Sequence, residues 1–317
     1  MIKIGILGIA HTHGYSYVRQ INKMQDAQVT GLYEENVEFA KRASSELNLK
    51  LFNTPQELLD SCDAVIIASE NSKHMKYTEM AALKHKHVLC EKPIAVNISD
   101  AEHMIKVCKE NNVVLQIAFP VRYAPSVRKA KETIDSGVLG DILAVSSTNH
   151  GTMPGSWFVE KELSGGGAVI DHTVHVVDIV RWLLNTEITN VSGFYDKLIY
   201  DELKVEDCGL LMLELSNGAF MTLDTSWSRP KAHPYWGDVT IRIVGTQGTL
   251  FIDAFDEKIE YYCNDKKNGW MNFDIKFDYN LIREFIDCIK TGRKPLTSGE
   301  DGLAALEVVL KAYAAKA

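Results

Sequence analysis

The chain has 317 residues and a formal net charge of −8, which suits two domains and argues against nucleic acid or an anionic membrane as a partner. Its hydrophobic content of 46% is ordinary for a globular protein, and no apolar run is long enough to cross a bilayer. The N-terminus enters a strand pattern at once and the six cysteines form no C-x-x-C pair. We therefore expect no signal peptide and a cytoplasmic protein with reduced cysteines.

In the first 120 residues, short runs rich in Val, Ile and Leu alternate with amphipathic helical patterns. Such alternation predicts βαβ units and a parallel sheet that is covered on both faces. The predicted strands cover residues 2–7, 28–33, 64–69, 87–91 and 113–119, and the predicted helices cover residues 18–23, 37–47, 77–84 and 100–110.

The first predicted strand runs into a loop that partly fits the dinucleotide-binding pattern G-x-G-x-x-G. Gly8 takes the first glycine position, whereas Ala10 and His13 stand at the second and third. In a dinucleotide-binding domain, this loop carries the pyrophosphate at the start of a helix. We therefore predict that Gly8 and Ala10 contact a cofactor.

The second predicted strand ends at Glu34, which lies 26 positions after Gly8. An acidic residue at about this separation accepts hydrogen bonds from the adenosine ribose. Glu35 and Asn36 follow, with no Arg or Lys immediately beside them to bind a 2′-phosphate. The sequence thus favours NAD over NADP, and the alternative interpretation is an exposed acidic turn.

The pattern changes near Pro120, where several strands begin to follow one another closely. The predicted helices lie at residues 126–136, 279–290 and 299–316, and the predicted strands at 141–149, 208–215, 219–226, 239–244, 249–253, 258–263 and 273–277. Asn217-Gly218 predicts a type I′ hairpin turn. We expect a dinucleotide-binding Rossmann domain at 1–120, then an α+β domain with a mainly antiparallel open sheet at 121–317, and a ligand cleft between them.

A glycine run, Gly165–Gly167, precedes a further helical pattern in this second half. Glycines allow close approach of the backbone to a ligand. Asp171 and His175 are four residues apart on the predicted helix, so both project from one face. A carboxylate beside an imidazole orients the ring and suits general acid/base chemistry. The alternative is a helix cap followed by a surface histidine.

Taken together, these segments resemble the Gfo/Idh/MocA family of NAD(P)-dependent oxidoreductases. The residues that carry the resemblance are Glu91-Lys92-Pro93 after the fourth strand, the segment 63–74, and the pattern Gly165–Gly167, Asp171, His175 and Asp178. The resemblance implies that Lys92 holds the reacting oxygen, His175 accepts the hydroxyl proton and Asp171 orients it. It also suggests a cis Lys92-Pro93 bond. It implies cofactor contacts from His11, Ser69, Asn71, His74, Glu91 and Lys92.

The resemblance further implies a sugar, inositol or related polyol as substrate, bound by Arg122, His150, Trp157 and His172. It implies a homodimer or homotetramer in which the open face of the second sheet packs on its mate. Alternating apolar residues are candidates for that face, although they could instead cover their own helices. They are Met221, Leu223, Ile241 and Ile243.

The histidines leave two other classes of function open. His11, His13, His150, His172 and His175 would suit a metal-dependent hydrolase or lyase if they converged, and a non-catalytic regulator that binds NAD or a sugar is a second alternative. No Cys or Glu stands at metal-ligand spacing from these histidines. We therefore expect no metal site and predict hydride transfer between NAD and a secondary alcohol.

Overall fold

The computed structural model describes residues 1–233, 237–255, 258–263, 266–272 and 276–315. They form two compact units. Unit 1 contains Met1–Pro120, Glu162–Gly165 and Asp278–Leu306, and unit 2 contains the remainder. The first division falls at Pro120, where the sequence pattern changes. Within the predicted second domain, however, Asp278–Leu306 packs with unit 1 instead.

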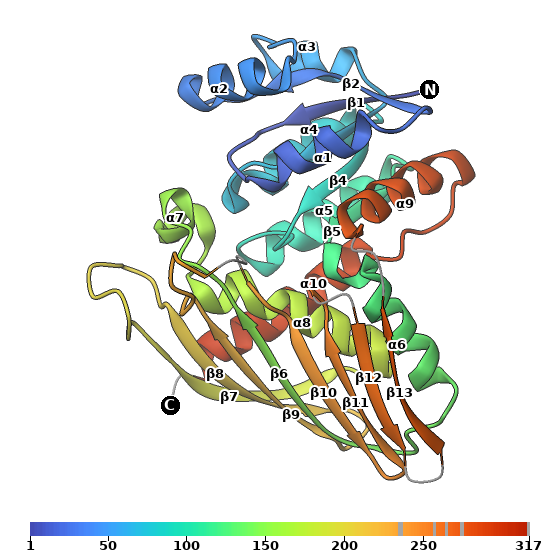
Figure 1. Ribbon diagram of the computed structural model, residues 1–317. Coiled ribbons are helices and arrows are strands. Elements are labelled where there is room, and N and C mark those ends of the chain that lie inside the picture. The colour runs from blue at the N-terminus through green and yellow to red at the C-terminus, as the bar shows by residue number, and fades with distance from the viewer. Residues whose placement is uncertain (234–236, 256–257, 264–265, 273–275, 316–317) are drawn as a thin grey trace. The chain divides into compact units, whose positions relative to one another are not determined.

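Unit 1 is built on a five-stranded parallel sheet, in the order β2-β1-β3-β4-β5 (Figure 1). Three of its strands are buried along almost their whole length, as expected for a sheet covered on both faces. This confirms the predicted Rossmann-type domain. The strands are β1 (Ile2–Leu7), β2 (Ala27–Tyr33), β3 (Ala64–Ile67), β4 (His87–Glu91) and β5 (Leu115–Ala118). The helices are α1 (His13–Ile21), α2 (Val37–Leu47), α3 (Pro55–Asp60), α4 (His74–Leu83), α5 (Ile98–Glu110) and α9 (Phe277–Thr291), with a 3-10 turn η1 (Asn71–Lys73).

The return of the chain to unit 1 is held by hydrogen bonds to β5. Ile117 N donates to Thr297 O at 2.9 Å, and Thr297 Oγ1 donates back to Ile117 O at 2.7 Å. Gln116 Nε2 donates to Leu281 O in α9 at 3.1 Å. The sequence shows α9 as an amphipathic helix but does not show which sheet it covers, so its place in the first unit is a structural finding.

Unit 2 is built on an eight-stranded sheet, in the order β13-β12-β11-β10-β6-β9-β8-β7. Among the strand pairs that the described residues form, only β6 and β9 run parallel, so the sheet is mainly antiparallel, as predicted. Helices α6 (Pro125–Asp135) and α8 (Ala168–Leu184) cover one face (Figure 1). The strands are β6 (Ile142–His150), β7 (Ile188–Asp196), β8 (Cys208–Leu215), β9 (Phe220–Ser226), β10 (Thr240–Gly245), β11 (Gly248–Asp253), β12 (Lys258–Cys263) and β13 (Lys266–Asn272). This unit also contains η3 (Ser156–Val159) and most of η2 (Pro120–Tyr123). Helix α7 (Lys161–Ser164) belongs mostly to unit 1, and α10 (Gly299–Ala314) begins in unit 1 and ends in unit 2.

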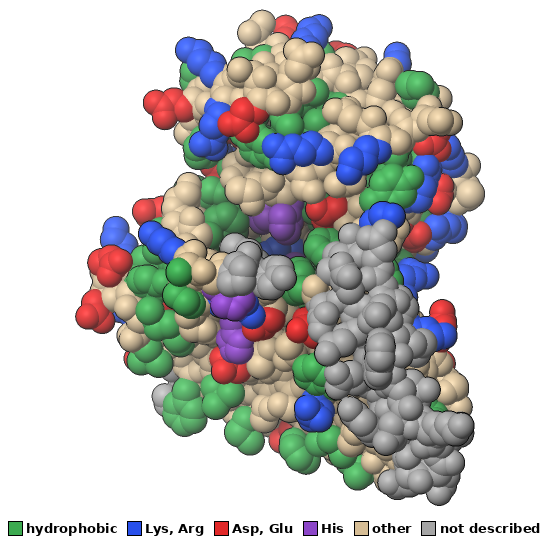
Figure 2. All heavy atoms as spheres, viewed as in Figure 1, with side chains coloured by type: hydrophobic (Ala, Val, Ile, Leu, Met, Phe, Trp, Pro, Cys, Tyr) green, Lys and Arg blue, Asp and Glu red, His purple; other side chains and the backbone are tan. Residues whose placement is uncertain are grey.

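The two faces of this sheet differ, and the four apolar residues considered for its open face follow the alternative interpretation, in which they cover the unit's own helices. Met221, Leu223, Ile241 and Ile243 have at most 1% of their surface exposed, because they point toward the unit's own helices. Alternation along the strands turns other apolar side chains to the opposite face. Figure 2 shows hydrophobic side chains gathered over β7, β8 and β9. The exposed apolar residues of these strands and of β6 are Leu143, Phe194, Leu210, Met212 and Phe220.

Two local predictions need correction. The β8–β9 hairpin forms, but only Gly218 has a positive φ (+87°), and Asn217 does not. Gly218 N donates to Leu215 O at 2.9 Å, so a type I turn followed by a left-handed glycine replaces the predicted type I′ turn. Of the predicted strand 273–277, residues 273–275 lie outside the described residues and Phe277 begins α9. Strands β7 and β13 were not among the predicted strands.

Among the described residues, no helix is long and apolar enough to cross a membrane. Five of the six cysteines are described as free thiols, and Cys208 is the only one of these five that is not buried.

Candidate functional site

The loop after β1 is pinned to the ends of two neighbouring strands. Gly8 N donates to Tyr33 O in β2 at 2.8 Å, and His11 N donates to Ala68 O, just after β3, at 2.8 Å. Gly8 has a φ of +81°, and a Cβ there would lie 2.5 Å from Ser69 Cβ. Glycine is therefore required at this position. The loop lies where β1 meets β3, at the carboxyl end of the sheet, where open α/β sheets bind ligands.

Glu34 is buried at the end of β2 and holds this loop from the other side. Its Oε2 accepts from Ile9 N and its Oε1 accepts from Asn36 N, both at 2.8 Å. A carboxylate oxygen has two lone pairs, so each oxygen retains capacity for a further donor. The geometry fits an adenosine ribose beside the loop, because a fixed carboxylate can accept hydroxyl donors there.

Three further residues predicted to contact the cofactor form hydrogen bonds within unit 1. Asn71 Nδ2 donates to Ser164 O at 2.8 Å, and Ser69 Oγ donates to Glu70 O at 3.1 Å. His74 is fully buried, and its Nδ1 donates to Pro93 O at 2.9 Å. Burial lowers the pKa of His74. The observed contacts of His74 therefore position the backbone that follows Lys92.

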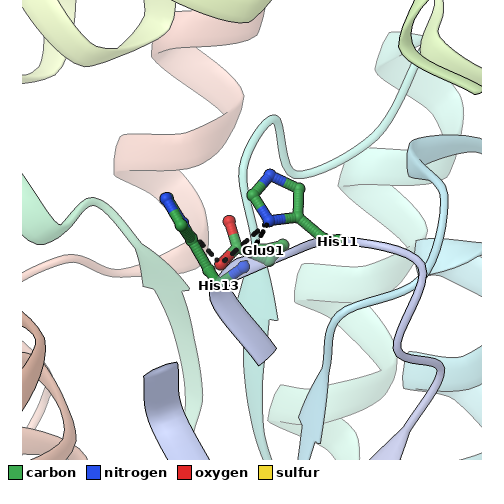
Figure 3. Close-up of side chains that lie close together, drawn as sticks. All are labelled: His11, His13 and Glu91. Atoms are coloured by element: carbon green, nitrogen blue, oxygen red, sulfur yellow. Dashed lines mark hydrogen bonds and ion pairs between the residues drawn. The ribbon is translucent and has the colours of Figure 1, made fainter. Parts of the chain in front are cut away.

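Glu91, at the end of β4, is fully buried at the centre of a polar cluster (Figure 3). Its Oε1 accepts from Tyr17 Oη at 2.5 Å and from His13 Nδ1 at 3.2 Å, and it lies 4.0 Å from His11 Nδ1. Its Oε2 accepts from Lys92 N at 3.2 Å. Burial disfavours the charge on Glu91, but His11, His13 and Lys92 outweigh it and hold the pKa of Glu91 well below its usual range.

This cluster is the nearest approach to a metal-binding arrangement among the described residues. One ligand atom from each of His11, His13 and Glu91 lies within 4.8 Å of the others. The sequence analysis missed Glu91 as a partner because it is 78 positions from His13. Its Oε1 already accepts two hydrogen bonds, so the observed geometry is that of a hydrogen-bonded carboxylate. Burial opposes protonation of His13, but Glu91 and Asp278 raise its pKa.

Lys92 follows Glu91 directly and is buried, with 3% of its surface exposed. The Lys92-Pro93 peptide bond is cis, as the family resemblance suggested.

The glycine run before α8 packs closely against other segments of this chain. A Cβ on Gly166 would lie 2.1 Å from Tyr313 Oη, and one on Gly167 would lie 1.9 Å from Glu206 O. Gly167 N and Val169 N both donate to Glu206 Oε1, at 2.8 and 3.2 Å. A carboxylate thus caps the positive end of α8. We interpreted these glycines as a place where the backbone approaches a ligand. In the structure, Gly166 and Gly167 are required for this packing within the chain.

Asp171 and His175 both lie on α8 with less than a tenth of their surface exposed. Asp171 Oδ2 accepts from Trp227 Nε1 at 3.2 Å and lies 3.4 Å from His172 Nε2. His172 is fully buried, and its Nδ1 donates to Asn149 O at 2.8 Å. The sequence analysis did not identify Trp227 or Asn149 as partners. Both come from strands or strand ends far from α8 in sequence.

Arg122 is engaged in a buried ion pair. Its guanidinium binds both carboxylate oxygens of Asp178, with Nε 2.9 Å from Oδ2, and lies 5.7 Å from the centre of the Trp182 ring. Arg122 is 2% exposed and Asp178 is fully buried. This contact gives Arg122 a structural role in unit 2, and its contact with substrate stays a prediction.

His150 is held between two carboxylates at the end of β6. Its Nε2 lies 3.3 Å from Asp224 Oδ2 and its Nδ1 2.9 Å from Asp238 Oδ2, which Arg229 also binds at 2.7 Å. Hydrogen bonds to Asp224 and Asp238 raise the pKa of His150 to about 9, so it is protonated at neutral pH. The side chain of His150 is 22% exposed.

Trp157, in η3, is 5% exposed and stacks on Phe158 with 3.9 Å between ring centres.

A parallel sheet with a glycine turn after β1 and a carboxylate fixed at the end of β2 defines a dinucleotide-binding protein. The "oxidoreductase family, NAD-binding Rossmann fold" matches residues 2–119, and the "GFO/IDH/MocA C-terminal domain" matches residues 127–251. The chain therefore belongs to the Gfo/Idh/MocA family of oxidoreductases.

Several named relatives align over most of the chain. Myo-inositol 2-dehydrogenase of Thermotoga maritima is 26% identical, with 99% of this chain and 95% of that protein covered. D-xylose 1-dehydrogenase [NADP(+)] of Haloarcula marismortui is 30% identical, with 81% and 73% covered. A solved levoglucosan dehydrogenase, in complex with NADH and levoglucosan, superposes with a TM-score of 0.86 at 22% identity, covering 99% of this chain and 96% of that one. This superposition confirms the fold.

Proposed function

We propose that this oxidoreductase transfers a hydride between NAD and a secondary alcohol of a sugar, inositol or related polyol. The observation that carries the proposal is the Glu34 carboxylate fixed against the glycine loop, 2.8 Å from Ile9 N, as a ribose-binding group requires. The relatives named for inositol and xylose support the substrate class. They support neither a metal-dependent hydrolase or lyase nor a non-catalytic regulator.

NAD is the preferred cofactor in this proposal, because Glu34 would meet the 2′-phosphate of NADP with a negative charge. Gly8, Ala10 and His11 would line the pyrophosphate, and Ser69, Asn71 and Glu91 would complete the cofactor's surroundings. His74 would act through Pro93. One relative is named for NADP and another was solved with NADH, so both cofactors occur in the family.

Three residues would carry the chemistry. When bound, NAD supplies an acceptor for the hydride that leaves the substrate carbon. Lys92 would hold the reacting oxygen with its ammonium and stabilise the negative charge that develops there. His175 would accept the hydroxyl proton, and Asp171 would orient it or bind a neighbouring hydroxyl. Trp227 Nε1 fixes Asp171 for either task.

Of the four residues predicted to contact the substrate, His150 is the strongest candidate, because its imidazolium is charged and partly exposed. Arg122, His172 and Trp157 are at least 95% buried. We therefore propose that these three position the residues around them.

We further propose a homodimer or homotetramer assembled through the exposed apolar face of β6–β9. Phe194, Met212 and Phe220 are each at least 59% exposed there. An apolar face of this kind is typical of an interaction surface. The cytoplasmic location stays a prediction, and the four buried described thiols are in accord with a reducing compartment.

The experiment that tests the function has two parts. Fluorescence titration with NADH should give saturable binding, and absorbance at the NADH band should rise when the enzyme meets NAD⁺ and one member of a panel of inositols, sugars and sugar acids. Activity should survive treatment with a chelator. Absence of NADH binding, or loss of activity with chelator, would refute the proposal.

A further inference from the structure

Two lysines converge on one carboxylate next to the ribose-binding candidate. Glu35 directly follows Glu34, and its Oε1 accepts from Lys76 Nζ at 2.8 Å. Its Oε2 lies 3.1 Å from Lys73 Nζ. Lys73 belongs to η1 and Lys76 to α4, some forty positions further along the chain. No basic residue stands next to Glu35 in the sequence, and the fold brings this pair to it.

We propose that Lys73 and Lys76 form a binding site for a phosphate monoester, the 2′-phosphate of an adenine dinucleotide, and that Glu35 occupies this site and thereby adds to the preference for NAD that Glu34 gives. The inference rests on the proposed function, because the adenosine ribose must lie beside Glu34. The Glu35 carboxylate would compete with the 2′-phosphate for the two lysines, because either anion can accept hydrogen bonds from both ammonium groups.

The local charge supports this competition. Glu35 pairs with both lysines, Lys73 Nζ also lies 3.1 Å from Glu70 Oε2, and Glu34 directly precedes Glu35. The group therefore carries one net negative charge when all five side chains are ionised. A phosphate monoester with a charge of about −1.5 to −2 would be repelled as a whole. Replacing Glu35 with a neutral amide removes both the competitor and the excess charge.

The turn does not depend on the Glu35 side chain. Asn36 Oδ1 caps α2 by accepting from Glu38 N and Phe39 N, at 3.0 and 3.1 Å, and Glu34 holds the preceding loop. The Glu35 side chain is 35% exposed. Hydrogen bonding to Lys76 and Lys73 lowers the pKa of Glu35 to about 2, so it is ionised throughout the neutral range. Glu35→Gln keeps an oxygen that can accept from Tyr77, so this substitution should change the charge and preserve the fold.

The test measures the dissociation constants of NADPH and NADH by fluorescence titration. Glu35→Gln should bind NADPH about tenfold more tightly than the wild type, which corresponds to about 1.4 kcal/mol. Its NADH affinity should stay within about twofold. NADH has a neutral 2′-hydroxyl where NADPH has a phosphate, so the two lysines gain no charged partner. The gain should shrink at high salt, where partly exposed charges are screened.

Two variants control the interpretation. Lys73→Met and Lys76→Met, added to Glu35→Gln, should abolish the gain in NADPH affinity. Glu38→Gln removes the same charge from an exposed position three residues further on and should leave the NADPH affinity unchanged. Thermal melting of each variant would confirm that the fold is intact.

Competition against NADPH bound to the Glu35→Gln variant identifies the source of the phosphate. 2′-AMP should displace NADPH more strongly than 5′-AMP or inorganic phosphate. Equal displacement by all three would overturn the inference, as would a gain that survives loss of both lysines. If NADH binds and Glu35→Gln gives no gain for NADPH, the inference fails alone. If neither dinucleotide binds any variant, the proposed function fails as well.

Discussion

Replacing Asp178 with Asn should destabilise unit 2 strongly, because it leaves the Arg122 charge buried without its partner. The guanidinium is 2% exposed and binds both oxygens of a carboxylate that is fully buried. Removing one partner of such a pair costs about 3–5 kcal/mol, since the remaining ion loses its compensation but stays out of water. At about 2–4 °C per kcal/mol for a domain of this size, the melting temperature should fall by about 6–20 °C.

The chain provides a matched control on the same helix. Arg181 and Glu187 form an equally close pair, with Nε 2.7 Å from Oε2, but the Glu187 side chain is 64% exposed. Exposed pairs contribute about 0–1 kcal/mol, so Glu187→Gln should shift the unfolding free energy by less than about 1 kcal/mol. The contrast isolates burial as the cause, because both pairs join an Arg to a carboxylate.

Urea denaturation followed by tryptophan fluorescence is a suitable assay, because Trp182 lies 5.7 Å from the Arg122 guanidinium. A paired Arg122→Met and Asp178→Leu variant should recover much of the loss, since no buried charge remains. A destabilisation of less than about 1 kcal/mol in Asp178→Asn would refute the argument. An Arg122→Lys variant with normal stability but a raised KM would instead support the substrate-binding role that the sequence suggested.

Three further outcomes follow from the site and the surface. His175→Ala and Lys92→Ala should each lower kcat by about a hundredfold or more while NADH affinity stays nearly unchanged, and full activity in either variant would contradict its assigned role. The pKa of His150 is raised to about 9, so its stabilising contribution is complete below about pH 6.5 and lost as the pH rises through 9. His150→Gln should therefore flatten the fall in melting temperature over that range, and an unchanged profile would count against the two-carboxylate clamp. Phe194→Lys with Met212→Lys should convert the oligomer to a 35.5 kDa particle in light scattering, whereas a wild type already of that mass would exclude the proposed assembly.

Much of the fold was predictable because the two halves follow simple burial rules. Continuous apolar runs give the parallel strands β3, β4 and β5, and alternating patterns give β8 and β9. Which side of an alternating strand faces the helices is not contained in the alternation itself. The apolar residues Met221 and Phe220 are neighbours, and only packing against α8 shows that Met221 is the buried one.

The candidate site was predictable where function lies in a local motif and obscure where it depends on distant partners. Glu34 and Asp171 were identified from spacing, but spacing could not show that Ile9 N or Trp227 Nε1 binds their carboxylates. Arg122 shows how a distant partner changes the interpretation of a motif residue. An arginine in a motif segment suggests a ligand contact, and its burial against Asp178 becomes visible only when both are folded.

The loop after β1 departs from the glycine motif but still meets the packing requirement that the motif serves. The third glycine of G-x-G-x-x-G allows a helix to pack closely on the sheet. His13 stands at that position, but the next residue is Gly14, where a Cβ would lie 2.9 Å from Ile9 Cδ1 and 3.1 Å from Ala68 Cβ. Gly14 therefore meets the close-packing requirement one position later. This leaves the His13 side chain available to bind Glu91 at 3.2 Å, which places a histidine beside the residue that precedes Lys92.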